Sequence, residues 1–476
     1  MKTMPRRGVI YTVAPSYKDI NTIWCGTDDG LIHITKDGGK TWKNVTPAEI
    51  TSWSKVSLMD ASHTDANTVY AAVNRIRCDD MHPYIYKTND AGKTWKKIVT
   101  GLPDDPINVV REDPKRKGLL FAGSERAVYV SFDDGEHWQS LRLNMPATSI
   151  RDLVIKDDDL VIGTHGRSFW ILDDITPLRQ LSGQIANKVA ILYKPQDTYR
   201  VRWDMYTDTP VPQEEPAGQN PPDGAVINYY LKEKATDVSL EIISKNDGGR
   251  TIKVKNYSNK DTLYKTGDLN IPHYWIRQQQ MLSNEPGSHR FMWDMKYDAL
   301  NIPPSYPIGA TYMNTAPDQT APWVMPGTYI ARLTVDGKIF DQTFTIKMDP
   351  RVKTSAKDLQ TQHDLSVQCY EGRKQCMKIL EEIRLYRLML RGQMTNPPVM
   401  VADEMNRKDK EAALLENNPP GSNDPSFRRM NNYFASIFGL LQESDRPPTT
   451  QALAAFAETQ KQLQELITKW NSLKGK

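Results

Sequence analysis

The sequence feature that most constrains the fold is an eight-residue pattern that occurs three times in the first third of the chain. Each copy reads Ser/Thr-x-Asp-x-Gly-x-x-Trp, and the copies cover residues 35–42, 88–95 and 131–138. Successive aspartates of the pattern are 53 and 43 residues apart, an interval that matches a four-stranded blade of a β-propeller. The repeat therefore predicts a propeller in this part of the chain.

Each octet is typical of a hairpin turn with three structural positions. The aspartate accepts backbone N–H bonds inside the turn, the glycine adopts a positive φ, and the tryptophan packs between neighbouring sheets. The residues assigned to these positions are Asp37, Gly39, Trp42, Asp90, Gly92, Trp95, Asp133, Gly135 and Trp138. The octet is thus a folding device and not a site of chemistry.

Two strand-like runs precede each octet and set the blades in register. The predicted inner strands cover residues 10–14, 56–61, 107–111 and 150–155. The predicted second strands cover residues 23–26, 69–73, 119–123 and 160–163. This pattern gives three complete blades and a partial fourth that ends near residue 174.

The turns between second and third strands open on the face opposite the octet turns, where propellers usually bind ligands. They cover residues 27–30, 74–83, 124–126 and 164–167, and all four carry charged side chains. The candidate ligand-binding residues in these turns are Asp28, Asp29, Arg75, Arg77, Asp79, Asp80, Glu125, Arg126, His165 and Arg167. Because turns are polar in most proteins, a solvated rim without a ligand is the alternative.

The middle of the chain changes to alternating strands that are separated by proline-rich loops. The strand candidates cover residues 225–232, 238–244, 290–295, 329–335 and 340–347, and Asp336-Gly337 suits a hairpin turn. Asp247-Gly248-Gly249 is expected to be a strand turn and not a phosphate loop, since no helix or Lys-Ser/Thr follows it. We expect an immunoglobulin-like β-sandwich here, with residues 210–222 running over a neighbouring surface.

After Pro350 the apolar residues follow a helical period. Ser355 is the predicted N-cap of a first helix, Asp424 starts a second that runs through Leu441, and Thr449 starts a third. Residues 395–423 are predicted to be a long connection with room for one short helix. The sequence therefore predicts a helical bundle that has a packing or partner-docking role.

Composition excludes several classes of function. Lys and Arg number 61 against 58 Asp and Glu, and the signs are mixed, so nothing indicates nucleic-acid binding. No stretch is apolar enough to span a membrane or to serve as an export signal. The four cysteines lack CxxC spacing, and Cys369 and Cys376 lie too far apart along one helix for a disulfide, so we expect buried thiols.

Catalytic and metal-binding motifs are also missing. The eight histidines form no HExxH or HxH pair, and no GxSxG occurs. For His165, which lies in a turn, a hydrogen bond to neighbouring backbone is a better interpretation than a metal ion. We therefore expect neither a metal nor a cofactor.

Several segments resemble one large bacterial family. The octets match the Asp boxes of sialidases, sortilin-type receptors and xyloglucan-cleaving cellobiohydrolases, in which the box is structural. The segments 24–31, 110–119 and 163–174 are similar to the last blades of the family labelled BNR-repeat glycosyl hydrolases or Vps10/sortilin-like proteins. The similarity continues through residues 215–225, 323–329 and 348–352.

The resemblance implies a mainly β, multidomain fold: a partial Asp-box propeller over residues 1–185, an immunoglobulin-like sandwich over 186–349 and a helical bundle over 350–476. Family members carry further blades upstream, and three and a half blades cannot close a ring. We therefore expect a second chain that supplies the missing blades, or a truncated product. The resemblance also implies a secreted, periplasmic or cell-envelope location.

Two functions from different classes follow. The first is a non-catalytic interaction protein whose propeller rim binds a peptide or glycan. The second is a sialidase-like or xyloglucanase-like glycoside hydrolase, whose inverting form needs two carboxyl groups about 6.5–9.5 Å apart with one of them protonated. Exposed rim aromatics would favour a sugar, whereas a basic or apolar groove would favour a peptide.

Overall fold

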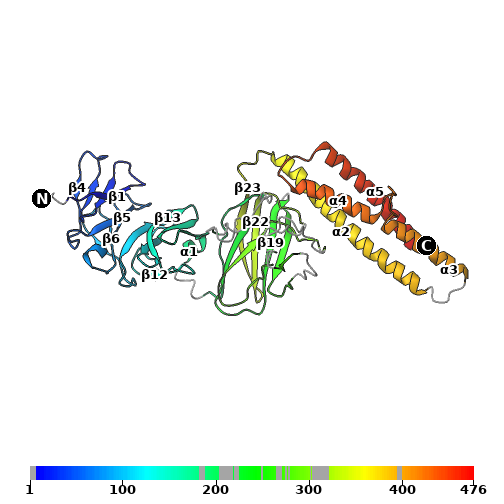
Figure 1. Cartoon of the computed structure of the whole chain (residues 1–476), viewed down its shortest axis with the longest axis horizontal. Coiled ribbons are helices and arrows are strands. Elements are labelled where there is room, and N and C mark those ends of the chain that lie inside the picture. The colour runs from blue at the N-terminus through cyan, green and yellow to red at the C-terminus, as the bar shows by residue number, and fades with distance from the viewer. Residues whose placement is uncertain are drawn as a thin grey trace. The chain divides into compact units, whose positions relative to one another are not determined.

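The computed structural model describes residues 7–181, 188–202, 218, 224–247, 250–263, 271–273, 276, 279–300, 302, 321–393 and 399–475. The chain divides into two compact units, Met1–Asn187 and Lys188–Lys476. Figure 1 colours the first unit blue to cyan and green, and the second green to red. Within the described ranges, no helix has the length and apolar character needed to cross a membrane. Apart from Gly218, the predicted proline-rich segment 210–222 lies outside these residues, as do Gly248 and Gly249.

The first unit consists of four antiparallel sheets that follow one another along the chain. Sheet 1 contains β1 (Ile10–Pro15), β2 (Ile23–Thr27), β3 (Ile32–Thr35) and β4 (Lys43–Asn44); sheet 2 contains β5 (Lys55–Ala61), β6 (Val69–Asn74), β7 (Tyr84–Thr88) and β8 (Lys96–Lys97). Sheet 3 contains β9 (Ile107–Glu112), β10 (Leu120–Ser124), β11 (Val128–Ser131) and β12 (Gln139–Ser140); sheet 4 contains β13 (Ser149–Lys156), β14 (Asp159–His165) and β15 (Phe169–Leu172). The predicted inner and second strands are confirmed to within a few residues.

Neighbouring sheets pack face to face, with their first strands side by side. β1 contacts β5, β5 contacts β9, and β9 contacts β13. β-branched and aromatic residues suit such a two-sided buried sheet, and each space between sheets holds its own apolar core. Trp24, Tyr70 and Phe121, one from each of the first three second strands, are buried in these cores. The described residues form a blade-like series of sheets, and the series does not close into a ring.

The three octets form the same turn. The Oδ1 atoms of Asp37, Asp90 and Asp133 each accept a backbone N–H four residues on, at 2.9 Å. The glycines at the fifth octet position, Gly39, Gly92 and Gly135, all have positive φ. These bonds close each hairpin, as the pattern predicts.

The octet tryptophans differ in what they contact. Trp95 donates its indole N–H to the Val45 carbonyl at 2.7 Å, and Trp138 donates to the Ile98 carbonyl at 2.9 Å, so each bonds to the chain that leaves the preceding sheet. Trp42 donates to Gly39 of its own turn at 3.2 Å and remains 44% exposed. The prediction that each tryptophan packs between two sheets is therefore wrong for Trp42, because no described sheet precedes sheet 1.

The second unit begins with two sheets that share one core. One sheet has the order β16 (Ala190–Leu192), β18 (Ala225–Leu231), β21 (Gly287–Trp293). The other has the order β17 (Thr198–Arg200), β23 (Lys338–Met348), β22 (Gly327–Val335), β19 (Val238–Asp247), β20 (Arg250–Ser258). Trp293 of the first sheet packs against Tyr329 and Phe344 of the second. The predicted strands are present, with a positive φ at Asp336 and Gly337 in the β22–β23 turn.

The helices are α1 (Thr176–Gln180) and the 3-10 helix η1 (Ile76–Cys78) in the first unit, and α2 (Ala356–Gln393), α3 (Val399–Glu416), α4 (Phe427–Gln442) and α5 (Thr450–Lys474) in the second. Ser355 and Thr449 cap α2 and α5 as predicted. The predicted start of α4 is wrong. α4 begins after Ser426, whose hydroxyl accepts the Arg429 N–H, and not at Asp424.

The prediction for the segment between α2 and α4 is also wrong. The sequence predicts a connection with room for one short helix, whereas the structure has a long helix there. α3 has 18 residues. Arg387 of α2 forms ion pairs with Asp409 and Glu416 of α3, which fix the two helices together. Cys369 and Cys376 are buried and free on α2, and burial raises both thiol pKa values to about 12.

Candidate functional site

One irregularity recurs in the first strand of all four sheets. The pairing register between first and second strands shifts by one residue near the start of the first strand, which is a β-bulge. The residues left unpaired by the shifts are Tyr11, Ser57, Asn108 and Arg151. Bulges re-aim side chains and are common next to functional sites. Since the first strands lie side by side, the four bulges occupy the same level of neighbouring sheets.

Polar side chains at this level connect one sheet to the next. Ser57 donates its hydroxyl to the Ile107 carbonyl at 3.4 Å, and the Asn108 amide donates to the Ile150 carbonyl at 3.1 Å. The amide of Asn74 donates to Oδ1 of Asn108 at 2.7 Å. Ser57 and Asn108, the bulged residues of sheets 2 and 3, therefore each donate a hydrogen bond to the next sheet. In both cases the acceptor is the carbonyl of the residue just before the bulge of that next sheet.

Glu125 lies at the end of this polar row. Its Oε1 atom accepts from the Asn108 amide at 3.0 Å and from Nη1 of Arg151 at 3.2 Å. Partial burial opposes ionisation, but neighbouring polar groups, among them the hydrogen-bonded Asn108 amide, and the charge of Arg151 outweigh it and lower the pKa of Glu125. The carboxylate is therefore ionised at neutral pH and acts as an anchor for Arg151.

Three cations lower the pKa of Tyr11, and one of them contacts its ring. Nζ of Lys55 lies 3.8 Å from the centroid of the Tyr11 ring. The hydrogen bond from Lys55 lowers the pKa of Tyr11, burial opposes this, and the charges of Lys55, Arg77 and Arg151 lower it further. We refer to Tyr11, Lys55, Arg77, Glu125 and Arg151 as the bulge site. It combines Tyr11 of sheet 1 with three cations and one carboxylate from sheets 2, 3 and 4.

The long turn of sheet 2 contributes Arg77 to the bulge site, but two of its other charged residues hold the turn itself. Nε of Arg75 lies 2.7 Å from Oδ2 of Asp80, and Nη1 donates to the Ser54 hydroxyl at 2.7 Å. Burial opposes ionisation of Asp80, but hydrogen bonds from His82, Tyr84 and Arg75 outweigh it and lower its pKa well below the usual range. Arg75 and Asp80 are therefore engaged in loop structure.

Asp28 and Asp29 likewise hold their own turn. Oδ1 of Asp28 accepts the Val9 N–H at 2.8 Å, and Oδ1 of Asp29 accepts the Thr27 hydroxyl at 2.5 Å. The Asp29 carbonyl accepts the Trp53 N–H at 2.8 Å. These bonds join the turn of sheet 1 to the start of β1 and to the connection before sheet 2.

The remaining predicted residues are exposed and lie outside the bulge site: Asp79, Arg126, His165 and Arg167. Nε of Arg126 lies 3.9 Å from Oδ1 of Asp105, and the Arg167 N–H donates to the Thr164 hydroxyl at 3.0 Å. Among the residues that the structure describes, no group of three His, Cys, Asp or Glu side chains could hold a metal ion. Of the ten predicted residues, Arg77 and Glu125 belong to the bulge site.

The sequence analysis places candidate binding residues only in turns. It therefore does not include Tyr11, Lys55, Asn108 and Arg151, which all lie within first strands. A signal was available in the sequence. Asn108 follows Ile107 and precedes Val109, and Arg151 follows Ile150, so each interrupts an apolar strand at its second or third residue. A polar residue at the same position of successive repeats would have indicated a shared inner site.

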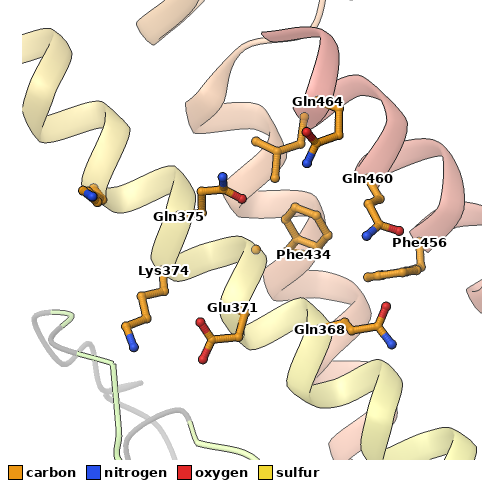
Figure 2. Close-up of a pocket in the computed structure, with 11 residues that line it drawn as sticks. Gln368, Glu371, Lys374, Gln375, Phe434, Phe456, Gln460 and Gln464 are labelled. Atoms are coloured by element: carbon orange, nitrogen blue, oxygen red, sulfur yellow. The ribbon is translucent and has the colours of Figure 1, made fainter. Parts of the chain in front are cut away.

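A separate cavity lies on the helices of the second unit. Its volume is about 550 Å³, and Figure 2 shows Phe434 and Phe456 beside the glutamines of α2 and α5 that line it. Phe434 also packs over Gly372. Its charged lining groups are Glu371, Lys374 and Lys378, and no carboxylate pair is present among them. The cavity is an amphipathic groove and carries no catalytic constellation.

Asp105 is a buried carboxylate near the bulge site that the sequence did not single out. It lies in the connection between sheets 2 and 3, accepts the Ser124 hydroxyl, and burial raises its pKa. A raised pKa means that the folded state loses stability as pH rises from the unfolded value of about 3.9 through the folded one.

We expect Asp105→Asn to remove this pH-dependent loss. The stability of the variant relative to the parent should increase as pH rises from about 4 to 7, because only the parent must ionise a buried group. Urea unfolding midpoints of both proteins across this pH range provide the measurement. Ser124→Ala, which removes the hydrogen bond but keeps the carboxyl, is the control. Parallel pH profiles for parent and Asp105→Asn would contradict the assignment.

No protein-family model matches the chain, and no curated protein matches it. Solved structures that it resembles include YCF48 bound to D1 peptide, with 19% identity over 36% of this chain and 53% of that chain at a TM-score of 0.28. A second is YCF48 from Cyanidioschyzon merolae, with 19% identity over 36% and 55% and a TM-score of 0.28. A third is the GH74 xyloglucanase from Xanthomonas campestris, with 14% identity over 52% and 38% and a TM-score of 0.30. The chain spans about half or less of each solved chain, and likeness at this level carries no functional argument.

Proposed function

We propose that this protein is a non-catalytic interaction protein whose first four sheets are propeller blades and whose bulge site binds an acidic segment of a peptide. The observation that carries the proposal is that Lys55 lies over the Tyr11 ring and that the charges of Arg77 and Arg151 also act on this side chain. Cations fixed on a rigid sheet edge bind carboxylates through charge-assisted hydrogen bonds and attract anionic ligands at a distance. Arg77 is exposed within η1, where a ligand can reach it.

The pKa directions favour binding over glycoside hydrolysis. A glycosidase of the inverting type needs one protonated carboxyl group beside an ionised one. The pKa values of Glu125 and Asp80 are lowered, so neither suits a general acid. The pKa of Asp105 is raised, but its side chain is buried and hydrogen-bonded to Ser124.

The composition of the bulge site favours a peptide over a glycan. Sugar sites present exposed aromatic faces, and the bulge site contains one aromatic side chain, Tyr11, whose ring already carries Lys55 on it. Its other members are charged. The cations outnumber the single carboxylate Glu125, so an acidic peptide can add charge-assisted hydrogen bonds that a neutral sugar cannot.

We further propose that a partner chain supplies blades that close the ring, in an octet-repeat propeller of the Asp-box kind. Supporting this proposal, the outer faces of sheets 1 and 4 carry exposed apolar side chains, among them Ile10 and Phe169. The family resemblance supports the immunoglobulin-like class of the sandwich and a location outside the cytoplasm. Fractionation of the source cells tests the location.

Binding of short labelled peptides tests the bulge site. Fluorescence anisotropy should show saturable, salt-sensitive binding of a peptide rich in Asp and Glu, and none of a Lys-rich peptide of equal length. Arg77→Glu should weaken binding at least about tenfold, since a charged hydrogen bond contributes about 1.5–3 kcal/mol.

Arg167→Glu is the matched control, because Arg167 is an exposed arginine on a turn of the same face outside the bulge site. It should leave the affinity within about twofold. The hydrolase alternative is tested in parallel with xyloglucan and a sialylated oligosaccharide. Release of sugar from either substrate, or equal loss of binding in both variants, would overturn the proposal.

A further inference from the structure

We propose that the peptide bound at the bulge site carries a large apolar residue beside its acidic residues, and that Trp53, Ile76 and Met81 receive that apolar residue. This inference rests on the proposed function and deepens it, because it names a second chemical requirement for the ligand. It comes from the two segments that carry Lys55 and Arg77, which are the connection that leads into β5 and the β6–β7 turn of sheet 2.

Each of these two segments exposes a large apolar side chain close to a cation of the bulge site. Trp53 lies two residues before Lys55 and is 37% exposed, and Ile76 directly precedes Arg77 in η1 and is 40% exposed. Met81, in the same β6–β7 turn, is 45% exposed. Because neighbouring Cα atoms are about 3.8 Å apart, Ile76 stands beside Arg77 in space as well as in the sequence. We call Trp53, Ile76 and Met81 the apolar patch.

The two segments are bonded to each other. Sγ of Cys78 donates to the Trp53 carbonyl at 3.7 Å, and Nη1 of Arg75 donates to the Ser54 hydroxyl at 2.7 Å. Cys78 and Arg75 belong to the turn, whereas Trp53 and Ser54 belong to the connection. These contacts hold the two segments side by side, so the apolar residues that they expose belong to one surface.

The β6–β7 turn is also tied at both of its ends. Nε of Arg75 lies 2.7 Å from Oδ2 of Asp80, and the Tyr84 hydroxyl donates to the same oxygen at 3.0 Å. At the start of the turn, Oδ1 of Asn74 accepts the Ile76 N–H at 2.9 Å. The turn therefore presents its apolar side chains in a preorganised form, and a preorganised surface loses little conformational entropy when a ligand covers it.

A ligand that is both acidic and apolar fits this surface better than one that is apolar throughout. Single exposed apolar residues are common on proteins and need no function, but here three large ones flank two cations of one site. A wholly apolar partner would take Lys55 and Arg77 out of water without supplying an anion, which costs free energy. Because sheet 2 lies between sheets 1 and 3, the sheets on either side of the patch are already present.

Fluorescence anisotropy of the whole chain with three labelled peptides of equal length and charge tests the apolar requirement. Each peptide carries the same run of aspartates with Leu, Phe or Ser at both ends, so that either direction of binding places one such residue at the patch. We expect the Leu and Phe peptides to bind at least about tenfold more tightly than the Ser peptide, because a large apolar side chain leaves water on binding.

Variants separate the patch from the cations. Ile76→Ser and Met81→Ser should each reduce the preference for the Leu and Phe peptides, while the affinity for the Ser peptide stays within about twofold and shows that the variant is folded. Arg77→Glu should weaken all three peptides by the same factor. Ile20→Ser is the matched control, because Ile20 is 90% exposed in the β1–β2 turn, at the end of β1 away from its bulge. It should leave all three affinities within about twofold.

Two outcomes would overturn the apolar patch alone. They are equal affinities of the parent for the Leu, Phe and Ser peptides, and a preference that both Ile76→Ser and Met81→Ser leave unchanged. Salt-sensitive binding of the Ser peptide would still support the proposed function in either case, because that binding needs only the cations. Failure of all three peptides to bind would instead refute the proposed function, and the apolar patch with it.

Discussion

Asp445→Ala should lower the free energy of unfolding of the second unit by about 3–5 kcal/mol, because it leaves a buried arginine without its counter-ion. Arg200 of β17 is buried, and its Nη2 atom lies 2.6 Å from Oδ1 of Asp445, in the connection between α4 and α5. Arg202 donates to the same oxygen at 2.7 Å. Burial lowers the pKa of Arg200 to about 10, even though Asp445 opposes this, so the guanidinium stays charged at neutral pH.

The effect should reach beyond the ion pair. Nη1 of Arg200 also donates to the Val324 carbonyl at 2.7 Å, and the Thr354 hydroxyl donates to the Asp445 carbonyl at 2.6 Å. The network therefore joins the sandwich to the start of α2 and the end of α4. Urea unfolding, followed by the helical circular dichroism of this unit, measures the change.

Asp341→Ala is the matched control for this prediction. Asp341 forms a two-bond ion pair with Arg332 on adjacent strands, but both side chains are exposed. An exposed pair contributes about 0–1 kcal/mol, so the control should change the unfolding midpoint only slightly. Equal losses in Asp445→Ala and Asp341→Ala would contradict the account of the buried pair.

Trp138→Ala is the second prediction with a large expected effect, about 3–5 kcal/mol of stability in the first unit. The Trp138 side chain is 3% exposed, and its N–H bonds to Ile98, so truncation removes core contacts and leaves a buried carbonyl without a donor. The loss should separate sheets 2 and 3, since Trp138 belongs to the core they share.

Trp42→Ala is the natural control, because Trp42 occupies the same octet position but is much more exposed. Its loss should be less than about half that of Trp138→Ala, since less apolar area leaves water on folding. Hydrogen exchange of peptides from β7 and β11 gives a local readout. Similar destabilisation by both variants would show that the octet acts within its own turn and not between sheets.

Much of the fold could be predicted because local chemistry repeats along the chain. The octets fix where each third strand ends, and the runs before them fix the first two strands. β20 was not predicted, although its alternation of charged residues such as Lys253 and Lys255 with apolar ones is the pattern of a strand with one exposed face, here at a sheet edge. The start of α4 was misplaced because Asp424 and Ser426 are both good caps; Ser426 accepts the Arg429 N–H, whereas the Asp424 carboxylate accepts the Ser422 hydroxyl.

The candidate site was less predictable than the fold. The sequence predicts that charged residues in turns bind a ligand, yet Arg75, Asp80 and Asp28 stabilise their own loops. Tyr11, Lys55 and Arg151 are far apart in sequence and come together only because first strands of successive sheets lie side by side. The bulges at Tyr11 and Arg151 are a feature of strand pairing, which a single strand sequence does not reveal.

Native mass spectrometry of the protein isolated from its source, with identification of every co-purifying chain, tests the central claim most directly. The account predicts a stoichiometric complex in which sheets 1 and 4 are covered by further octet-bearing sheets, from a second copy or from a different chain. The protein isolated alone, with no bound chain or peptide at any concentration, would contradict it.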